Sequence, residues 1–292
     1  MRNLTIALLA TTLLAGQQKP LITDYFTASI GPVPASLNLD PFYTRYIDAE
    51  GIPIVSSEKP PVAALLVARD IVVHMLAKRP DVREAMIAKK YRVVVMAQTE
   101  MTTDLPEQRN WKKPPPPANM PQERRAAYEK MTDKEYWDNR ARGMGGNPTS
   151  GTEENLLGYP GTKYYGENIF MHEFSHAILG GGVRSADPML YEEVKDAYAA
   201  AMAAGKWKGH YAATSVQEYW AEASQTWFWS NFGFHDGDKY IISPDDLKEY
   251  DPKIYELLSR VYPDHHVPMD VYYSKDIHPT SGRIPGNPPG RE

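Results

Sequence analysis

A five-residue stretch with the residue types of a metal site, His172-Glu173-Phe174-Ser175-His176, is the most informative part of this 292-residue sequence. On an α-helix, two residues four positions apart lie one above the other on one face, so both imidazoles can chelate one metal ion. Glu173 lies beside that pair, where its carboxylate can take a proton from a water molecule that the metal activates. The spacing therefore predicts a zinc site with His172 and His176 as ligands and Glu173 as general base.

The residues around this stretch must form the helix that holds it. Apolar side chains recur at helical spacing and predict a buried face opposite the histidines. Three consecutive glycines, Gly180 to Gly182, follow the stretch. Because glycine readily takes the positive φ that closes a helix, we expect the helix to end there. The apolar positions are Phe170, Phe174, Ala177 and Ile178.

A catalytic zinc ion needs a third protein ligand and one open coordination position. A third histidine shortly after the motif is absent, because Leu179 and Gly182 occupy the positions where extended motifs carry the glycine and the histidine. The chain contains no cysteine, so the remaining ligand must be a histidine or a carboxylate. A glutamate on a second helix is the expected third ligand.

Two pairs of downstream glutamates are candidates for this ligand. Glu192 and Glu193 lie one turn into a helix that Asp187-Pro188 is expected to begin, with aspartate as cap and proline as first helical residue. Glu218 and Glu222 lie one turn apart on a later helix, so their carboxylates share one face. The residues alone leave both pairs open.

The helix that carries Glu218 and Glu222 is predicted to run from Thr214 to Phe228. Thr214 and Gln217 have the spacing of a capping box, which leaves Glu218 free for another role. Two carboxylates in so aromatic a helix are costly to bury unless they are paired or bound to a metal. The alternative is a solvated helix face that carries two ordinary glutamates.

The positions of Tyr211, Glu218 and Glu222 resemble those in zinc peptidases of the anthrax lethal-factor type. That group also includes secreted bacterial endopeptidases that cut between prolines. The resemblance implies that Glu218 is the third zinc ligand, that Tyr211 stabilises the oxyanion, and that Glu222 supports the site from behind. It covers residues 166–230, about a quarter of the chain, and implies no substrate preference because the N-terminal part is not matched.

Residues 1–18 have the layout of a signal peptide, with Met1 and Arg2 before a weakly apolar run from Leu4 to Gly16. This run is too short to span a membrane, so we expect a secreted or periplasmic protein without stable membrane insertion. The net charge of −5 does not favour nucleic acid as a partner. We expect a monomer that meets a peptide or protein substrate.

Residues 19–292 are predicted to form a single α+β domain that is rich in helix and has a small sheet. The best strand is at 91–96, a run of β-branched residues that could be central or could pair with an extended substrate. Residues 149–165 are expected to be a loop along the cleft. Residues 264–292 form a tail rich in proline and glycine.

Residues 104–146 differ in character from the rest of the domain and predict an excursion on its surface. Pro114 to Pro117 must run as an extended polyproline II segment, and a charged helix is expected from Pro121 to Arg142. A tetraproline segment can dock a partner, but it also serves as a stiff solvated connector. The sequence leaves its role open.

These observations together predict an exported zinc-dependent metalloendopeptidase. The same metal chemistry could serve a hydrolase that acts on a non-peptide bond, and a secreted binding protein could keep the site without turnover. Glu173 and Tyr211 favour an enzyme, because a site that only binds zinc needs neither residue.

Overall fold

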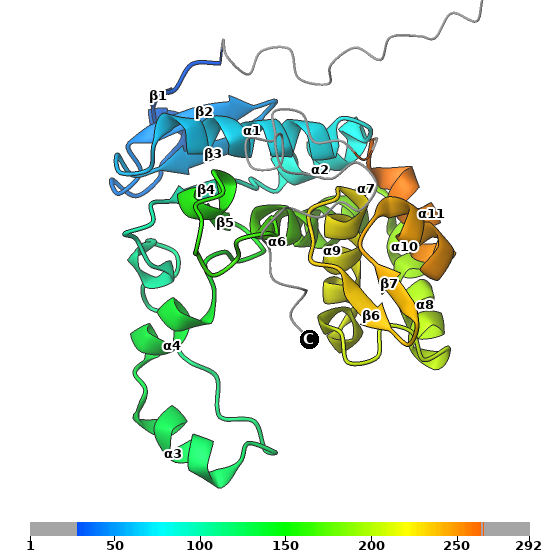
Figure 1. Cartoon of the computed structure of the whole chain (residues 1–292). Coiled ribbons are helices and arrows are strands. Elements are labelled where there is room, and N and C mark those ends of the chain that lie inside the picture. The colour runs from blue at the N-terminus through cyan, green and yellow to red at the C-terminus, as the bar shows by residue number, and fades with distance from the viewer. Residues whose placement is uncertain (1–27, 264, 266–292) are drawn as a thin grey trace, which may run out of the picture.

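The computed structural model describes residues 28–263 and 265. The N-terminal part of this region contains a five-stranded sheet (Figure 1). The first three strands pair antiparallel and the last three pair parallel. The predicted signal peptide and the predicted tail, apart from residue 265, lie outside the described residues. In order across the sheet, the strands are β1 (Gly31–Pro32), β2 (Arg45–Ala49), β3 (Ile52–Ser56), β4 (Val93–Met96) and β5 (Thr149–Thr152).

The strand predicted at 91–96 is β4, and it lies inside the sheet between β3 and β5. All four of its residues are buried. Val93 and Val95 pack into the main core, whereas Val94 and Met96 face a smaller apolar cluster on the opposite side. Because β4 is paired along both edges, it is a central strand and cannot pair with a substrate.

The expectation of a loop at 149–165 is wrong for its first half, which forms β5 and the short helix α5 (Glu153–Leu156). The small polar residues of β5 give a weak strand signal, so its pairing with β4 overrides local propensity. Gly151 also allows a close approach to the next layer. A Cβ atom at Gly151 would lie 2.7 Å from Cδ2 of Phe170, on the helix that carries the predicted metal ligands.

Helices cover the sheet and continue beyond it. The pair α1 (Val62–Leu76) and α2 (Pro80–Ala88) connects β3 to β4, and α6 (Ile169–Ala177) packs against β5. Next to α6 lies a helical group with a small hairpin, which is coloured from yellow-green to orange in Figure 1. No helix among residues 28–263 is long and apolar enough to cross a membrane. The group comprises α8 (Pro188–Ala203), α9 (Val216–Trp227), α10 (Pro244–Tyr250), α11 (Pro252–Val261), β6 (Phe234–Asp236) and β7 (Lys239–Ile241).

The glycine run does not end α6, contrary to the expectation from sequence. The chain continues from α6 through the π-helical turn η3 (Ile178–Val183) into α7 (Arg184–Ala186). None of the three glycines has a positive φ. Gly182 instead allows α2 to approach, since a Cβ atom there would lie 2.5 Å from Cγ1 of Val82. The small size of glycine, rather than its backbone freedom, therefore explains why position 182 is a glycine.

The N-terminal cap of α9 also differs from the prediction. The cap is Ser215, whose Oγ accepts a hydrogen bond from the backbone N–H of Glu218 at 3.2 Å. Thr214 ends the short 3₁₀ helix η4 (Tyr211–Thr214), and its hydroxyl donates to the carbonyl of Tyr211 at 2.7 Å. The cap residue and its bond fix the position of Glu218 in the first turn of α9.

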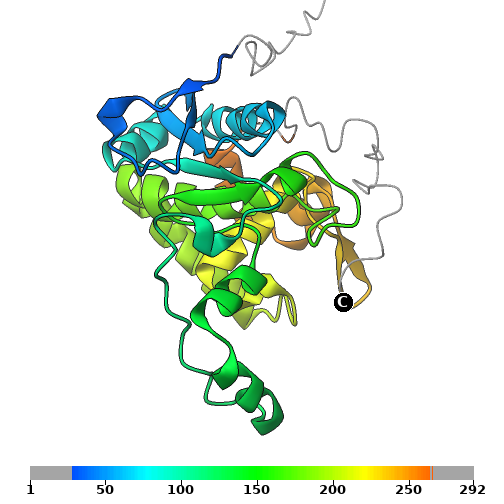
Figure 2. The same ribbon diagram turned by 90° about the vertical axis from the view of Figure 1, so that its left-hand side faces the viewer.

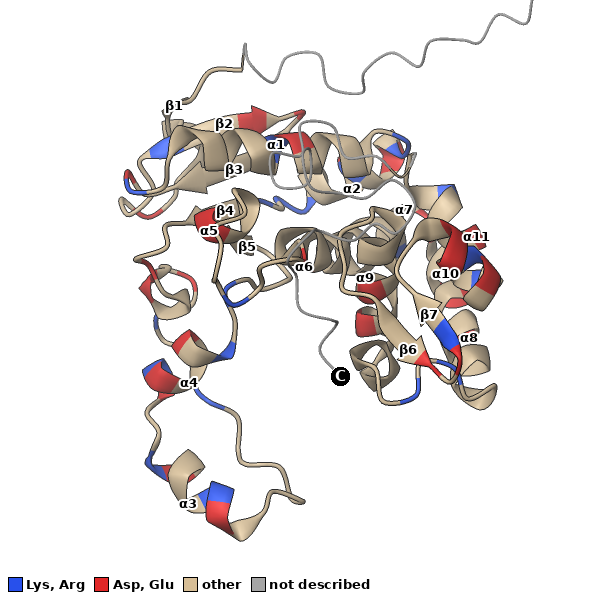
Figure 3. Cartoon of the chain, viewed as in Figure 1, with Lys and Arg blue, Asp and Glu red and all other residues tan. Residues whose placement is uncertain are grey.

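Only the middle of the predicted excursion projects from the body of the protein, as Figures 1 and 2 show. Its two ends belong to the body, since Leu105 is buried and Gly145 lies against His176. We call residues 111–140 the arm. It contains two helices, α3 (Gln122–Lys130) and α4 (Asp133–Arg140), instead of the single helix expected from Pro121 to Arg142. The break occurs because Thr132 begins a new helix and forms a capping box with Glu135. Neither helix has a buried residue, and both carry charges of both signs (Figure 3).

The contact between Gly182 and α2 predicts a pair of contrasting variants. Gly182→Ala would push a methyl group into Val82, a stiff β-branched side chain in the core, and should lower the free energy of unfolding by about 1–3 kcal/mol. Gly180→Ala is the control, because its Cβ atom would meet no other atom within 4 Å. Urea unfolding of both variants measures the difference. Equal stability would show that α2 yields freely at this contact.

Candidate metal centre

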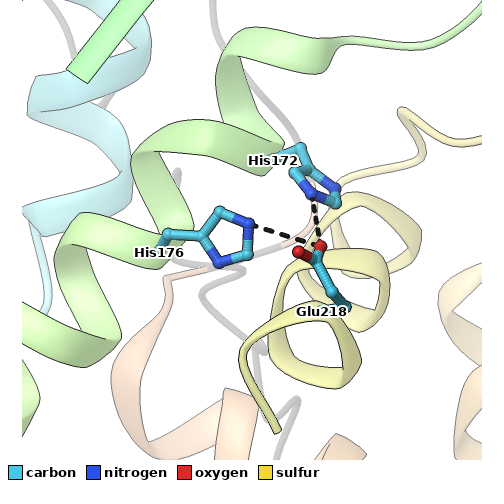
Figure 4. Close-up of side chains that lie close together, drawn as sticks. All are labelled: His172, His176 and Glu218. Carbon is cyan, nitrogen blue, oxygen red and sulfur yellow. Dashed lines mark hydrogen bonds and ion pairs between the residues drawn. The ribbon is translucent and has the colours of Figure 1, made fainter. Parts of the chain in front are cut away.

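The three predicted ligands come together where α6 and α9 pack side by side (Figure 4). Oε2 of Glu218 lies 3.0 Å from Nε2 of His172 and 3.4 Å from Nε2 of His176. Tetrahedral zinc with bonds of about 2.0–2.2 Å separates its ligand atoms by roughly 3.3–3.6 Å. The distance to His176 lies within this range and the distance to His172 is slightly shorter, as a direct hydrogen bond requires. The two-imidazole, one-carboxylate donor set suits a catalytic zinc ion.

The competing pair of glutamates lies elsewhere. Glu192 is exposed and accepts a hydrogen bond from Lys195 at 2.6 Å, three residues along the same helix. Glu193 pairs with the guanidinium of Arg260 through contacts of 2.6 and 3.1 Å. Among the described residues, only the set of His172, His176 and Glu218 offers three close metal-ligand atoms. The geometry thus favours Glu218 over Glu193 as the third ligand.

Gln225 orients the first histidine, although its place in the sequence does not single it out. Its Oε1 lies 2.9 Å from Nδ1 of His172, while its Nε2 donates to the carbonyls of Asn168 and Ser230 at 3.1 and 3.4 Å. Because the amide nitrogen is committed to carbonyls, Oε1 must accept the proton of Nδ1, so Nε2 is the nitrogen that a neutral His172 would offer to a metal. Gln225 follows Glu218 by seven residues, two helical turns on the same face, and that spacing could have indicated it.

Glu222 lies behind the site, as the resemblance implies, but its contact with the histidine is longer. Its Oε1 is 3.6 Å from Nδ1 of His172. Its Oε2 accepts a hydrogen bond from Nδ2 of Asn231 at 2.7 Å and lies 3.9 Å from Nε2 of His210. Glu222 therefore adds negative charge behind His172, while Gln225 makes the orienting hydrogen bond.

The electrostatics of the cluster favour a cation between its members. Burial disfavours protonation of His172, but the hydrogen bond to Glu218 and the charge of Glu222 outweigh it and raise the pKa of His172 to about 10. Burial also acts to raise the pKa of Glu218, yet hydrogen bonds with both histidines hold that pKa well below its usual range. A metal ion between these groups would supply the positive charge that the protons supply here.

Glu173 lies in the same cavity and contacts the segment that precedes β5. Burial raises the pKa of Glu173 above its usual range, although the charges of the two histidines oppose the rise. The backbone N–H of Gly145 donates to its carboxylate. A Cβ atom at Gly145 would lie 3.0 Å from Cβ of His176 and 3.2 Å from Oε2 of Glu173. The small residue allows this segment to lie directly over the motif.

Tyr211 begins η4 and presents its hydroxyl to the cluster. The hydroxyl donates to Oε1 of Glu218 at 3.2 Å, and the ring stacks at 6.3 Å on that of His172. Burial and the charge of Glu218 raise the pKa of Tyr211 to about 12, a rise that the charge of Arg140 opposes. The hydroxyl therefore remains protonated at neutral pH and is able to donate a hydrogen bond.

The predicted site residues all line one cavity of about 650 Å³. These are the three ligands together with Glu173, Tyr211 and Glu222, and Arg140 lines the cavity from the base of the arm. No protein-family model matches this chain, and no curated protein matches it. The interpretation of the cavity therefore depends on the identity and geometry of its residues.

The first prediction from this geometry concerns the ligands. Purified protein should contain about one zinc ion per chain, and His172→Ala, His176→Ala or Glu218→Ala should each lose it, because removal of one of three ligands leaves an incomplete site. Glu193→Ala should retain zinc, since Glu193 pairs with Arg260. Elemental analysis after gel filtration measures the content. Zinc loss in the Glu193 variant with retention in the Glu218 variant would reverse the assignment.

A second prediction concerns Gln225. Gln225→Leu removes the acceptor for Nδ1 of His172 and should weaken zinc affinity about tenfold to a hundredfold, as changes behind a ligand do. Gln217→Leu is the control on the same helix, because Gln217 lines the cavity but makes no hydrogen bond to His172 among the described residues. Competition with a chelator measures both affinities. Equal affinities would show that His172 is oriented without Gln225.

Proposed function

We propose that this protein is an exported zinc-dependent metallopeptidase that hydrolyses peptide bonds. The observation that carries the proposal is the convergence of His172, His176 and Glu218 in a cavity also lined by Glu173 and Tyr211. The first three side chains supply a donor set for zinc, and the other two supply a base and a hydrogen-bond donor. Export rests on the composition of residues 1–18.

The chemistry divides between the metal and the side chains. A zinc ion in this site supplies Lewis acidity toward a carbonyl oxygen and lowers the pKa of a water molecule. Glu173 takes a proton from the attacking water and returns it to the leaving amine. Tyr211 donates its hydroxyl proton to the oxyanion that develops on the carbonyl.

The choice of a peptide bond rests on the resemblance to the lethal-factor-type peptidases, in which the same roles fall on the same spacing of residues. Tyr211 adds support, because its hydroxyl here is held by a carboxylate ligand and can turn to a substrate oxygen without leaving the cavity. A site that only stores zinc has no use for this donor or for Glu173. These two residues support an enzyme over a binding protein.

The mechanism is tested by two variants that leave the ligands intact. Glu173→Gln should retain zinc and fold but abolish turnover, because an amide cannot take the proton. Tyr211→Phe should lower kcat about a hundredfold to a thousandfold with little change in KM, because its hydroxyl acts on the oxyanion. A proteome-derived peptide library, digested with and without chelator, supplies the substrate for these measurements.

Each variant also has an outcome that contradicts the proposal. Activity unaffected by Glu173→Gln would come from another site or from a contaminant. An unchanged kcat for Tyr211→Phe would reduce the tyrosine to a packing role against His172. Zinc-loaded protein that cleaves no peptide in the library, but hydrolyses a non-peptide ester or amide, would identify the other class of hydrolase.

A further inference from the structure

Arg140 is a cation in the cavity without a partner among the described residues. It ends α4, its side chain is exposed, and it lines the same cavity as Glu173 and Tyr211. Arg142, two residues further along, shows the contrast: its guanidinium bonds to Glu154 at 2.7 Å and to the carbonyls of Glu100 and Ala97. Arg142 therefore has a structural role, whereas no described group accepts from the guanidinium of Arg140.

The backbone of Arg140 is held in place although its side chain is not. Nζ of Lys163 donates to the carbonyl of Arg140 at 2.8 Å and lies 3.3 Å from that of Asn139. These bonds attach the base of the arm to the loop that precedes α6. Three residues after Arg140, Gly143 packs on the catalytic helix, where a Cβ atom would lie 3.2 Å from Cγ of Glu173. The backbone is thus anchored at Arg140 and again at Gly143, where it lies against the proposed general base.

Stabilisation of the end of α4 does not explain why an arginine stands at position 140. A cation at the C-terminal end of a helix can interact with the last carbonyls and with the helix dipole. Here Lys163 already bonds to those carbonyls. The other charged side chains that line the cavity, apart from the two histidines, are all glutamates: Glu167, Glu173, Glu218 and Glu222.

We propose that Arg140 binds a carboxylate of the substrate close to the scissile bond. The planar guanidinium presents paired N–H donors that match a carboxylate, which makes arginine well suited to this recognition. The carboxylate comes either from an acidic side chain or from the C-terminus of a short peptide. This inference rests on the proposed peptidase function and adds a substrate preference to it. Arg140 is then a specificity-determining residue, and the chemical step belongs to Glu173 and Tyr211.

The test measures binding separately from cleavage. Zinc-loaded Glu173→Gln protein binds labelled short peptides that carry Glu, Gln or Lys at successive positions, each with a free or an amidated C-terminus. At one position, or at the free terminus, the carboxylate should tighten binding about tenfold over its neutral counterpart. If amidation removes the tighter binding, the carboxylate is that of the peptide C-terminus. If replacement of Glu by Gln removes it, the carboxylate is that of the side chain. Fluorescence anisotropy gives each Kd.

Substitutions of arginine then assign the preference. In the same background, Arg140→Gln should abolish it and Arg140→Glu should reverse it in favour of Lys. Arg124→Gln is the matched control, because Arg124 is an exposed arginine of α3 that does not line the cavity. The preference should also shrink as salt screens the pair. All Arg140 variants retain the zinc ligands, so their zinc content should stay that of the parent.

The results separate failure of this inference from failure of the proposed function. A carboxylate preference that survives Arg140→Gln, or the absence of any such preference, overturns the role of Arg140 and leaves the peptidase proposal untouched. Peptides that bind in an Arg140-dependent manner, but that the unaltered zinc-loaded protein never cleaves, would keep the binding role and reject the peptidase.

Discussion

The close approach of α6 and α9 is the constraint on which the site depends. It brings the carboxylate of Glu218 within 3.4 Å of both motif histidines, across a gap of 42 residues from His176. Burial of the aromatic face of α9, with Tyr219 and Trp220 fully enclosed, fixes how the helix lies against its neighbours. Apolar packing of α9 thus sets the distance between Glu218 and the two histidines.

Three glycines allow neighbouring segments to pack closely against α6 and against η3, which continues it. Gly151 of β5 admits Phe170, Gly182 admits Val82 of α2, and Gly145 lies against the motif itself. A side chain at any of these positions would push a neighbouring element away from the ligand helix. Catalytic groups must be held within about 0.5 Å of their working positions. The close packing at these glycines and the hydrogen bond that Gln225 accepts from His172 both serve this purpose. Both hold the side chains of the predicted ligands in place.

The sequence predicted the parts of the site that depend on local spacing. His172, Glu173 and His176 follow from helical periodicity, and β4 follows from its β-branched run. Glu218 could not be separated from Glu193 by spacing alone, because the choice depends on which helix packs against α6. Gln225 was missed for the same reason: its amide matters only because the fold places it at Nδ1 of His172. The glycine run was misread because its use is close packing, which a sequence does not display.

The central claim is that His172, His176 and Glu218 bind one zinc ion, and crystallography with zinc tests it most directly. Crystals grown with zinc, measured on both sides of the zinc absorption edge, locate the metal by its anomalous signal independently of any assay. The account predicts one strong peak at about 2.0–2.2 Å from Nε2 of each histidine and from a carboxylate oxygen of Glu218. A fully occupied zinc site elsewhere, with this cluster empty and the histidines still bonded to Glu218, would contradict it.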